Sequence, residues 1–131
     1  MTRLAVAALA AVSLAGCGGS PGDLMALGTS GGPAGVNQTI VVRLDGGASC
    51  NRGQLRNITN SQLLVADAIV RDAKPYTTRA QTFPPGRAGG RAFVLRDQDG
   101  TVRWYETSTG LPPVFARAEL LALRLTPLLC R

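Results

Sequence analysis

The strongest local signal in this chain is the start of a helix, Thr-Asn-Ser-Gln from position 59. The pattern fits a capping box, in which the Thr59 side chain caps the first turn and Gln62 reaches back to the Thr59 backbone. Ile58 and Leu63 have the spacing of a hydrophobic staple around it. Apolar residues then follow at helical spacing, namely Leu63, Ala66, Ile69, Val70 and Ala73. We therefore predict an amphipathic helix that begins after Thr59 and is stopped by Pro75.

Strand signals lie on both sides of this helix. Residues 39–44 are short and β-branched and are followed by a glycine-rich turn, which predicts one strand. Residues 92–96 and 101–106 are rich in strand formers and flank the sequence Asp-Gln-Asp-Gly. Gly100 at the end of that sequence supplies the positive φ of a bulged turn. The two runs therefore predict a β-hairpin.

The last predicted element lies between two proline positions, Pro113 and Pro127. The apolar residues at helical spacing in this segment are Phe115, Ala118, Ala122 and Leu125. Pro127 is expected to end the helix. Leucines also alternate with other residues from Leu121 to Leu125, so a strand is the alternative, and we favour the helix. The order strand, helix, hairpin, helix predicts an α+β fold, with a small antiparallel sheet and two helices packed on one face.

The net charge and the absence of histidine limit the catalytic and binding functions that the chain can have. The chain has a formal net charge of +6, nearly all of its cations are arginine, and Lys74 is its only lysine. Histidine is absent, which excludes a Ser-His-Asp or Cys-His arrangement and removes the commonest metal ligand. A GC-rich genome would also encode much of this arginine, which is the alternative explanation of the bias. The charge nevertheless predicts attraction to anionic lipid headgroups or wall polymers.

The N-terminus has the three zones of an export signal. Arg3 supplies a positive start, and residues 4–14 form an apolar run too short to span a bilayer. The sequence Leu-Ala-Gly-Cys ending at Cys17 resembles the lipobox of bacterial lipoproteins. The resemblance implies that residues 1–16 are removed and that Cys17 carries a diacylglyceryl group, whose two chains hold the protein at a bacterial membrane. Conventional cleavage after Ala10 is the alternative.

The resemblance sets the expected domain organisation. Residues 17–38 are expected to be the lipidated cysteine and a flexible Gly/Pro/Ser linker, and residues 39–131 a small globular domain. If Cys17 is acylated, Cys50 and Cys130 remain, and in an oxidising envelope they predict one disulfide. Two free thiols, or pairing with a partner protein, are the alternatives. The resemblance implies an extracytoplasmic location, on the outer face of the cell membrane or at the periplasm and outer membrane, and this location argues against nucleic acid as a partner.

The carboxylates do not predict a catalytic or metal site. Asp97 and Asp99 precede a glycine and match a fragment of a calcium-loop pattern, but Glu106 is not where that loop needs its last ligand. We interpret the two aspartates as turn residues. Glu119 stands alone beside two arginines. The sequence therefore predicts no metal and no cofactor.

Four arginines are the candidate partner surface: Arg87, Arg91, Arg96 and Arg103. They cluster around a Pro/Gly loop and the predicted hairpin, and they would form an anion-binding surface if they share one face. Scattered solubilising charge is the other interpretation. Trp104 is more typical of a core residue in a strand than of a contact residue.

Three function hypotheses follow. The first is a membrane-anchored envelope lipoprotein that acts as a non-catalytic binding module for an envelope protein, anionic lipid or wall polymer. The second is an inhibitor of a secreted or envelope enzyme that inserts the loop around Pro84. The third is a small hydrolase that depends on carboxylates or on a Ser/Lys pair with Lys74. We favour the first, because no catalytic constellation is apparent.

Overall fold

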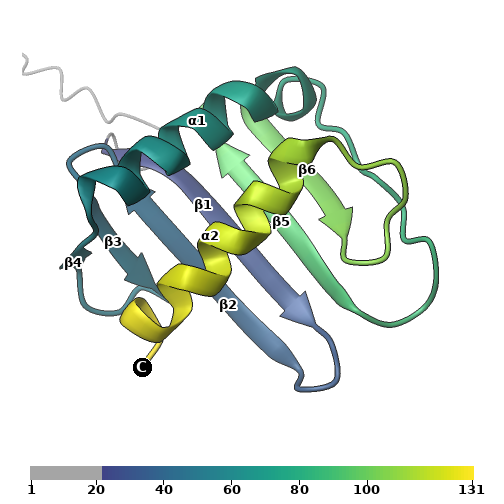
Figure 1. Cartoon of the computed structure of the whole chain (residues 1–131), viewed down its shortest axis with the longest axis horizontal. Helices are drawn as coiled ribbons and strands as arrows, with labels where there is room; N and C mark the ends of the chain where they lie inside the picture. Colours follow the sequence, from purple (N-terminus) through teal and green to yellow (C-terminus); the bar gives the residue numbers. More distant parts are fainter. Residues whose placement is uncertain (1–21) are drawn as a thin grey trace, which may run out of the picture.

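Six antiparallel strands and two helices make up residues 22–131, the part of the chain that the computed structural model describes. The strands lie side by side in the order β4-β3-β2-β1-β5-β6. Both helices, α1 (Asn60–Thr77) and α2 (Pro113–Leu129), lie on the same face of the sheet (Figure 1). The strands are β1 Asp23–Gly31, β2 Val36–Arg43, β3 Gly47–Cys50, β4 Arg56–Asn57, β5 Arg91–Asp97 and β6 Gly100–Tyr105. The predicted α+β fold is confirmed, with its antiparallel sheet, its hairpin (β5 and β6) and both helices on one face.

The prediction of a flexible linker over residues 17–38 is wrong from Asp23 onward, because residues 23–38 form β1, a turn and the start of β2. The folded domain therefore includes residues 23–38 and does not begin at residue 39. In β1 the buried residues alternate with small ones, so the strand pattern is hidden by a composition rich in glycine, alanine and serine. Gly32 and Gly35 have positive φ and form the turn of a β1–β2 hairpin. The leader and Cys17 lie outside the described residues.

Helix α1 begins with the predicted capping box. Thr59 Oγ1 accepts a hydrogen bond from the Gln62 backbone N–H at 3.1 Å, and Gln62 Oε1 accepts one from the Thr59 N–H at 2.9 Å. Ala66, Ile69 and Ala73 are buried along the face that packs on the sheet. These residues confirm the predicted helix and its apolar stripe.

Neither proline stops its helix where the sequence predicted. Pro75 lies inside α1, which continues to Thr77, and Pro127 lies inside α2, which continues to Leu129. A proline in the last turn removes one N–H from the hydrogen-bond ladder but leaves the later residues free to complete the turn. Thr78 and Cys130 do so, donating their N–H groups to the carbonyls of residues 74 and 126. The choice of helix over strand for the last element is confirmed.

The core lies between the helices and the covered face of the sheet. Trp104 of β6 is fully buried and packs between Phe93 of β5 and Phe115 of α2, with ring centroids 5.4 and 4.6 Å from its own. This confirms Trp104 as a core residue. Segment 81–83 runs beside β6, and the Phe83 and Arg103 N–H groups donate to the Arg103 and Gln81 carbonyls. This outer strand of the sheet is therefore not left unpaired.

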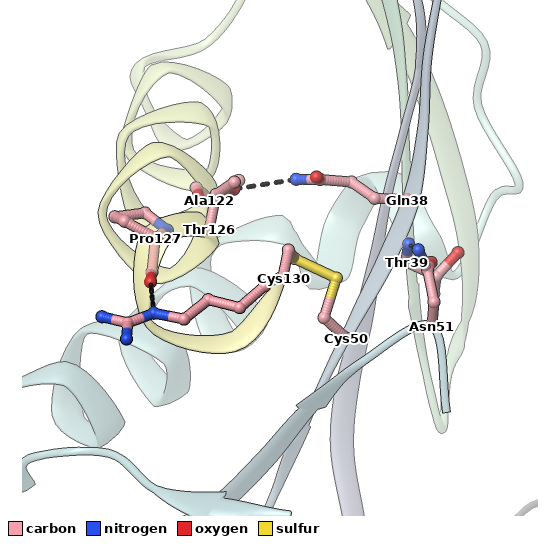
Figure 2. Close-up of a disulfide and its surroundings, with 9 residues drawn as sticks. Gln38, Thr39, Cys50, Asn51, Ala122, Thr126, Pro127 and Cys130 are labelled. Atoms are coloured by element: carbon pink, nitrogen blue, oxygen red, sulfur yellow. Dashed lines mark hydrogen bonds between the residues drawn. A yellow bond between two sulfur atoms is a disulfide. The ribbon is translucent and has the colours of Figure 1, made fainter. Parts of the chain in front are cut away.

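Cys50 and Cys130 form the predicted disulfide, with their Cα atoms 5.2 Å apart (Figure 2). The bond joins the end of β3 to the residue that follows α2, across a sequence separation of 80. It therefore fastens the C-terminal end of α2 to the sheet. Closing a loop of this size removes chain entropy from the unfolded state worth roughly 4.5 kcal/mol, as an upper figure.

Candidate binding groove

A groove of about 360 Å³ runs between α2 and the strands that it crosses. Thr29 of β1 and Phe93 of β5 contribute to its floor, and α2 forms one wall. Gln38 of β2 donates a hydrogen bond to Thr126 Oγ1 of α2 at 2.8 Å (Figure 2), which ties the helix to the sheet beside the groove. The residues that line it are Thr29, Val36, Gln38, Arg91, Phe93, Ala116, Glu119, Leu120, Ala122, Leu123 and Thr126.

The α2 wall of the groove is apolar and faces solvent. Leu123 is 63 % exposed and Leu120 is 45 % exposed. Both leucines lie on the part of α2 that does not pack on the core, whereas Ala122, next to Leu123, is buried. A single exposed leucine is ordinary on a protein surface, but here two of them border a concave site.

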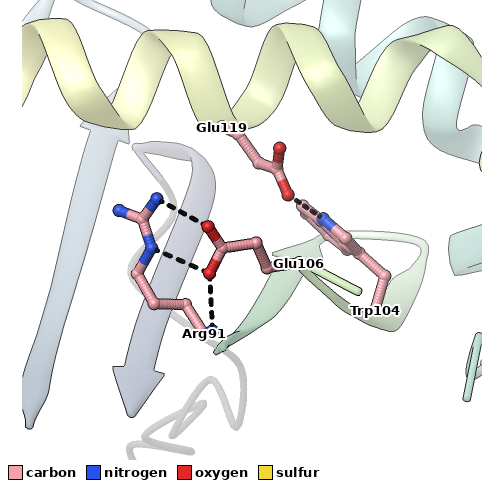
Figure 3. Close-up of polar contacts among 4 residues, drawn as sticks. All are labelled: Arg91, Trp104, Glu106 and Glu119. Carbon is pink, nitrogen blue, oxygen red and sulfur yellow. Dashed lines mark hydrogen bonds and ion pairs between the residues drawn. The ribbon is translucent and has the colours of Figure 1, made fainter. Parts of the chain in front are cut away.

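Glu119 is the charged group of this wall. Its Oε1 accepts a hydrogen bond from the indole N–H of Trp104 at 3.1 Å (Figure 3). Within residues 22–131 its carboxylate has no second hydrogen bond and no ion pair. The pKa of Glu119 is raised, chiefly because partial burial disfavours the charged form, while the Trp104 hydrogen bond opposes the shift. The carboxylate therefore has an oxygen available to a hydrogen-bond donor that enters the groove.

Arg91, the cation that lines the groove, is already paired. Its backbone N–H and its Nε donate to Glu106 Oε2 at 2.9 and 3.4 Å, and its Nη2 donates to Oε1 at 3.3 Å (Figure 3). The backbone hydrogen bond from Arg91, followed by its side-chain bonds, lowers the pKa of Glu106. Because Arg91 is paired with Glu106, it only partly compensates the charge of Glu119, which forms no ion pair of its own within residues 22–131.

The four arginines of the predicted anion surface do not share one face. Arg91 has the strand parity of the buried Phe93 and lies on the helix side, whereas Arg96 and Arg103 lie on the uncovered face. Arg87 sits in the loop before β5, where its N–H donates to Thr107 Oγ1 at 3.4 Å. The reason is the period of two along a strand, which puts positions 91 and 96 on opposite sides.

The uncovered face of the sheet is hollowed near the start of β1, in a concavity of about 1000 Å³. The small side chain of Ala26 leaves space at the floor of this hollow, and Ala26 is paired with Val41 on one side and with Arg96 on the other. Gly28 continues the row of small residues along β1. The residues around the hollow are Asp23, Leu24, Met25, Ala26, Thr39, Val41, Leu44, Asn51, Arg52, Arg96, Asp97 and Gln98.

The remaining candidate residues have structural roles or stand apart. Asp97 Oδ1 accepts hydrogen bonds from the N–H groups of Asp99 and Gly100, which confirms the interpretation of a turn. Lys74 is exposed near the end of α1 and forms no ion pair within the described residues. No group of three or more potential metal ligands occurs in residues 22–131.

Comparisons of the chain with protein-family models, with curated proteins and with solved structures found no match. In the described part of the chain, neither helix combines the length and the apolar character that a membrane span requires. The geometry of the described residues offers two candidate sites, the groove beside α2 and the hollow on the uncovered face. Sequence reasoning missed both, because residues far apart in the chain form them.

Proposed function

We propose that this protein is a membrane-anchored lipoprotein of the bacterial envelope that acts as a non-catalytic binding module, and that its partner occupies the groove beside α2. The lipobox resemblance that ends at Cys17 supports the anchor. The observation that carries the binding site is Glu119, a half-buried carboxylate that forms no ion pair within residues 22–131 and is set in a wall of exposed leucines.

The groove favours a particular chemistry in its partner. Leu120 and Leu123 offer apolar surface that is removed from water when an apolar segment packs against it. Glu119 selects a segment that also carries a hydrogen-bond donor, such as an amine or a guanidinium group, because its carboxylate is partly shielded from solvent. An apolar peptide segment with one cationic side chain fits both requirements.

Photo-crosslinking in native membranes tests this proposal. A photoreactive residue replaces Leu123 in the groove, or Leu64, which is 70 % exposed on α1 and does not line the groove. We expect a specific adduct from position 123 that position 64 does not give. The same adducts from both positions, or none from position 123, would contradict the proposed site.

A charge-removing variant sharpens the same experiment. Glu119→Gln keeps an oxygen that can accept the Trp104 hydrogen bond but removes the negative charge. We expect it to reduce the adduct from position 123 severalfold, because a charge-assisted hydrogen bond is about twice as strong as a neutral one. An unchanged yield would mean that the partner does not use Glu119.

One observation favours enzyme inhibition as a second candidate function. The loop around Pro84 is exposed but held in place, because the single Ser108 O–H is shared between the Phe83 and Pro84 carbonyls and Thr107 Oγ1 donates to the Arg87 carbonyl. A loop fixed in this way loses little conformational freedom on insertion into another protein. Titration of the domain against a panel of envelope proteases and muramidases tests it, with a glycine-serine replacement of residues 84–87 as the control.

A further inference from the structure

The start of β1 limits how far the domain can lie from a lipid on Cys17. Six residue steps separate Cys17 from Asp23. Fully extended, they span at most about 22 Å. A domain of this size has a radius of gyration of about 13 Å and is therefore more than about 26 Å across. The longest possible tether is shorter than this width. The surface around Asp23 must therefore stay close to the bilayer that holds the lipid.

The uncovered face begins at this point. Asp23 and Leu24 lie on the rim of its hollow, so the tether enters the domain beside it. Leu44, which also lines the hollow, is 60 % exposed. Leu55 is 52 % exposed and lies over the uncovered side of Gly47 in β3. Apolar side chains of this kind enter the boundary between headgroups and acyl chains when a surface lies on a membrane.

The charges of this face suit anionic headgroups. Arg52, Arg96 and Arg103 are exposed, and none of them forms an ion pair within the described residues. Asp23 is the opposing charge on the rim of the hollow, and Asp97 nearby already accepts two backbone N–H groups with one oxygen. Each arginine near an anionic surface contributes about 1 kcal/mol of attraction, which corresponds to roughly fivefold in affinity.

We propose that the uncovered face of the sheet lies against the bilayer, with the exposed leucines at the headgroup boundary and the arginines on anionic headgroups. The inference rests on the proposed lipid anchor at Cys17. Because the helices cover the opposite face, this orientation turns the groove beside α2 away from the membrane and leaves it accessible to a partner (Figure 1).

A synthetic anchor tests the orientation independently of natural lipidation. In the chain from Cys17 onward, which contains all of the described fold, Cys17 is the only cysteine outside the disulfide. It can therefore be coupled to a maleimide lipid in vesicles of phosphatidylcholine with phosphatidylglycerol. Hydroxyl-radical footprinting then compares four exposed leucines, with Leu44 and Leu55 on the uncovered face and Leu64 and Leu123 on the helices.

We expect coupling to the vesicles to reduce oxidation of Leu44 and Leu55 severalfold and to leave Leu64 and Leu123 unchanged. Protection of Leu64 or Leu123 instead would place the helices on the bilayer and overturn the proposal. If coupling left the oxidation of each of the four leucines unchanged, that result would also overturn the proposal. A negative result in this experiment would overturn the orientation but not the proposed anchor on Cys17. The anchor is tested separately, by the intact mass of the protein purified from its native membrane.

A matched pair of charge variants tests the arginines. Arg96→Gln with Arg103→Gln removes two positive charges from the uncovered face, and Lys74→Gln with Arg124→Gln removes two from the helices. In a Cys17→Ser background without any lipid, we expect the first pair to lower cosedimentation with the same vesicles on the order of tenfold. The second pair is expected to leave it near the starting value. Equal losses would mean that only net charge matters, which contradicts a docking face.

Discussion

The two faces of the sheet are built from alternating residues of the same strands, yet their side chains differ in size. In β1 the covered face receives Met25, Leu27 and Thr29, while the uncovered face receives Ala26, Gly28 and Ser30. Large side chains on the covered side fill the space under the helices and stabilise the fold. Small ones on the other side contribute little to packing and leave the hollow open. Stability and surface shape are therefore assigned to opposite faces.

The largest test of this contrast compares two neighbouring aromatic residues of β6. Trp104 is fully buried, whereas Tyr105 points to the uncovered face and is half-buried. We expect Trp104→Ala to lower the free energy of unfolding by about 3–5 kcal/mol, because it leaves a cavity under α2. Tyr105→Ala should cost about 1 kcal/mol or less. Urea denaturation followed by circular dichroism measures both, and equal losses would contradict the division between the faces.

Removing the disulfide should have the next largest effect. We expect Cys50→Ser with Cys130→Ser to lower the free energy of unfolding by about 2–5 kcal/mol, because the unfolded chain regains the entropy of an open loop. The same variant releases the last turn of α2 from β3, which should weaken binding in the groove. Thermal melts with and without reductant measure the first effect. A melting temperature of the native chain that does not respond to reductant would contradict it.

The two glutamates beside the groove should give the chain opposite responses to pH. The pKa of Glu119 is raised by burial, so its contribution to stability is complete below its ordinary value of 4.5 and is lost as pH rises through the raised pKa. The pKa of Glu106 is lowered by Arg91, so its contribution is present above 4.5 and is lost as pH falls through the lowered pKa.

Two isosteric variants separate these responses. Glu119→Gln should remove the part of the stability loss that occurs as pH rises, and Glu106→Gln should remove the part that occurs on acidification. Urea midpoints collected between about pH 3 and pH 7 measure both profiles. Profiles that change in the same direction would show that the two environments have been assigned wrongly.

The smallest effect is expected on the floor of the uncovered face. A Cβ atom added at Gly28 meets Val94 Cβ at 3.7 Å, which is ordinary van der Waals contact. We expect Gly28→Ala to change the free energy of unfolding by no more than about 1 kcal/mol, since a glycine within a strand carries an entropy cost that alanine reduces. A larger loss in a denaturation experiment would mean that the small residues of β1 serve the fold itself.

Local chemistry made part of the fold predictable. The capping box at Thr59 needs only neighbouring residues, and the β5–β6 hairpin needs only two strand-forming runs and a turn, so both could be identified from the sequence. The pairing of Cys50 with Cys130 followed from the number of cysteines once Cys17 was set aside. Strand β1 was missed because Gly28, Ser30 and Gly31 resemble a linker in composition, although the buried Met25 and Leu27 alternate with less buried residues.

The sites were less predictable than the fold because they depend on contacts between distant segments. Glu119 gave no signal in the sequence, since its partner Trp104 lies on a strand that only the tertiary fold brings beside α2. The division of the arginines was accessible only in part, because the predicted strand 92–96 includes Arg96 but not Arg91, which the observed strand β5 adds at its start. The end of α2 past Pro127 depends on the hydrogen bond of Cys130 and on its disulfide, which local rules do not include.

The anchor is tested most directly by the intact mass of the protein purified from its native membrane, measured with and without reduction. We predict a chain that begins at Cys17, carries a diacylglyceryl group, and gains the mass of two hydrogens when the Cys50–Cys130 bond is reduced. A chain that keeps its leader, or that lacks the lipid, would contradict the anchored binding module and the orientation on the bilayer inferred from it.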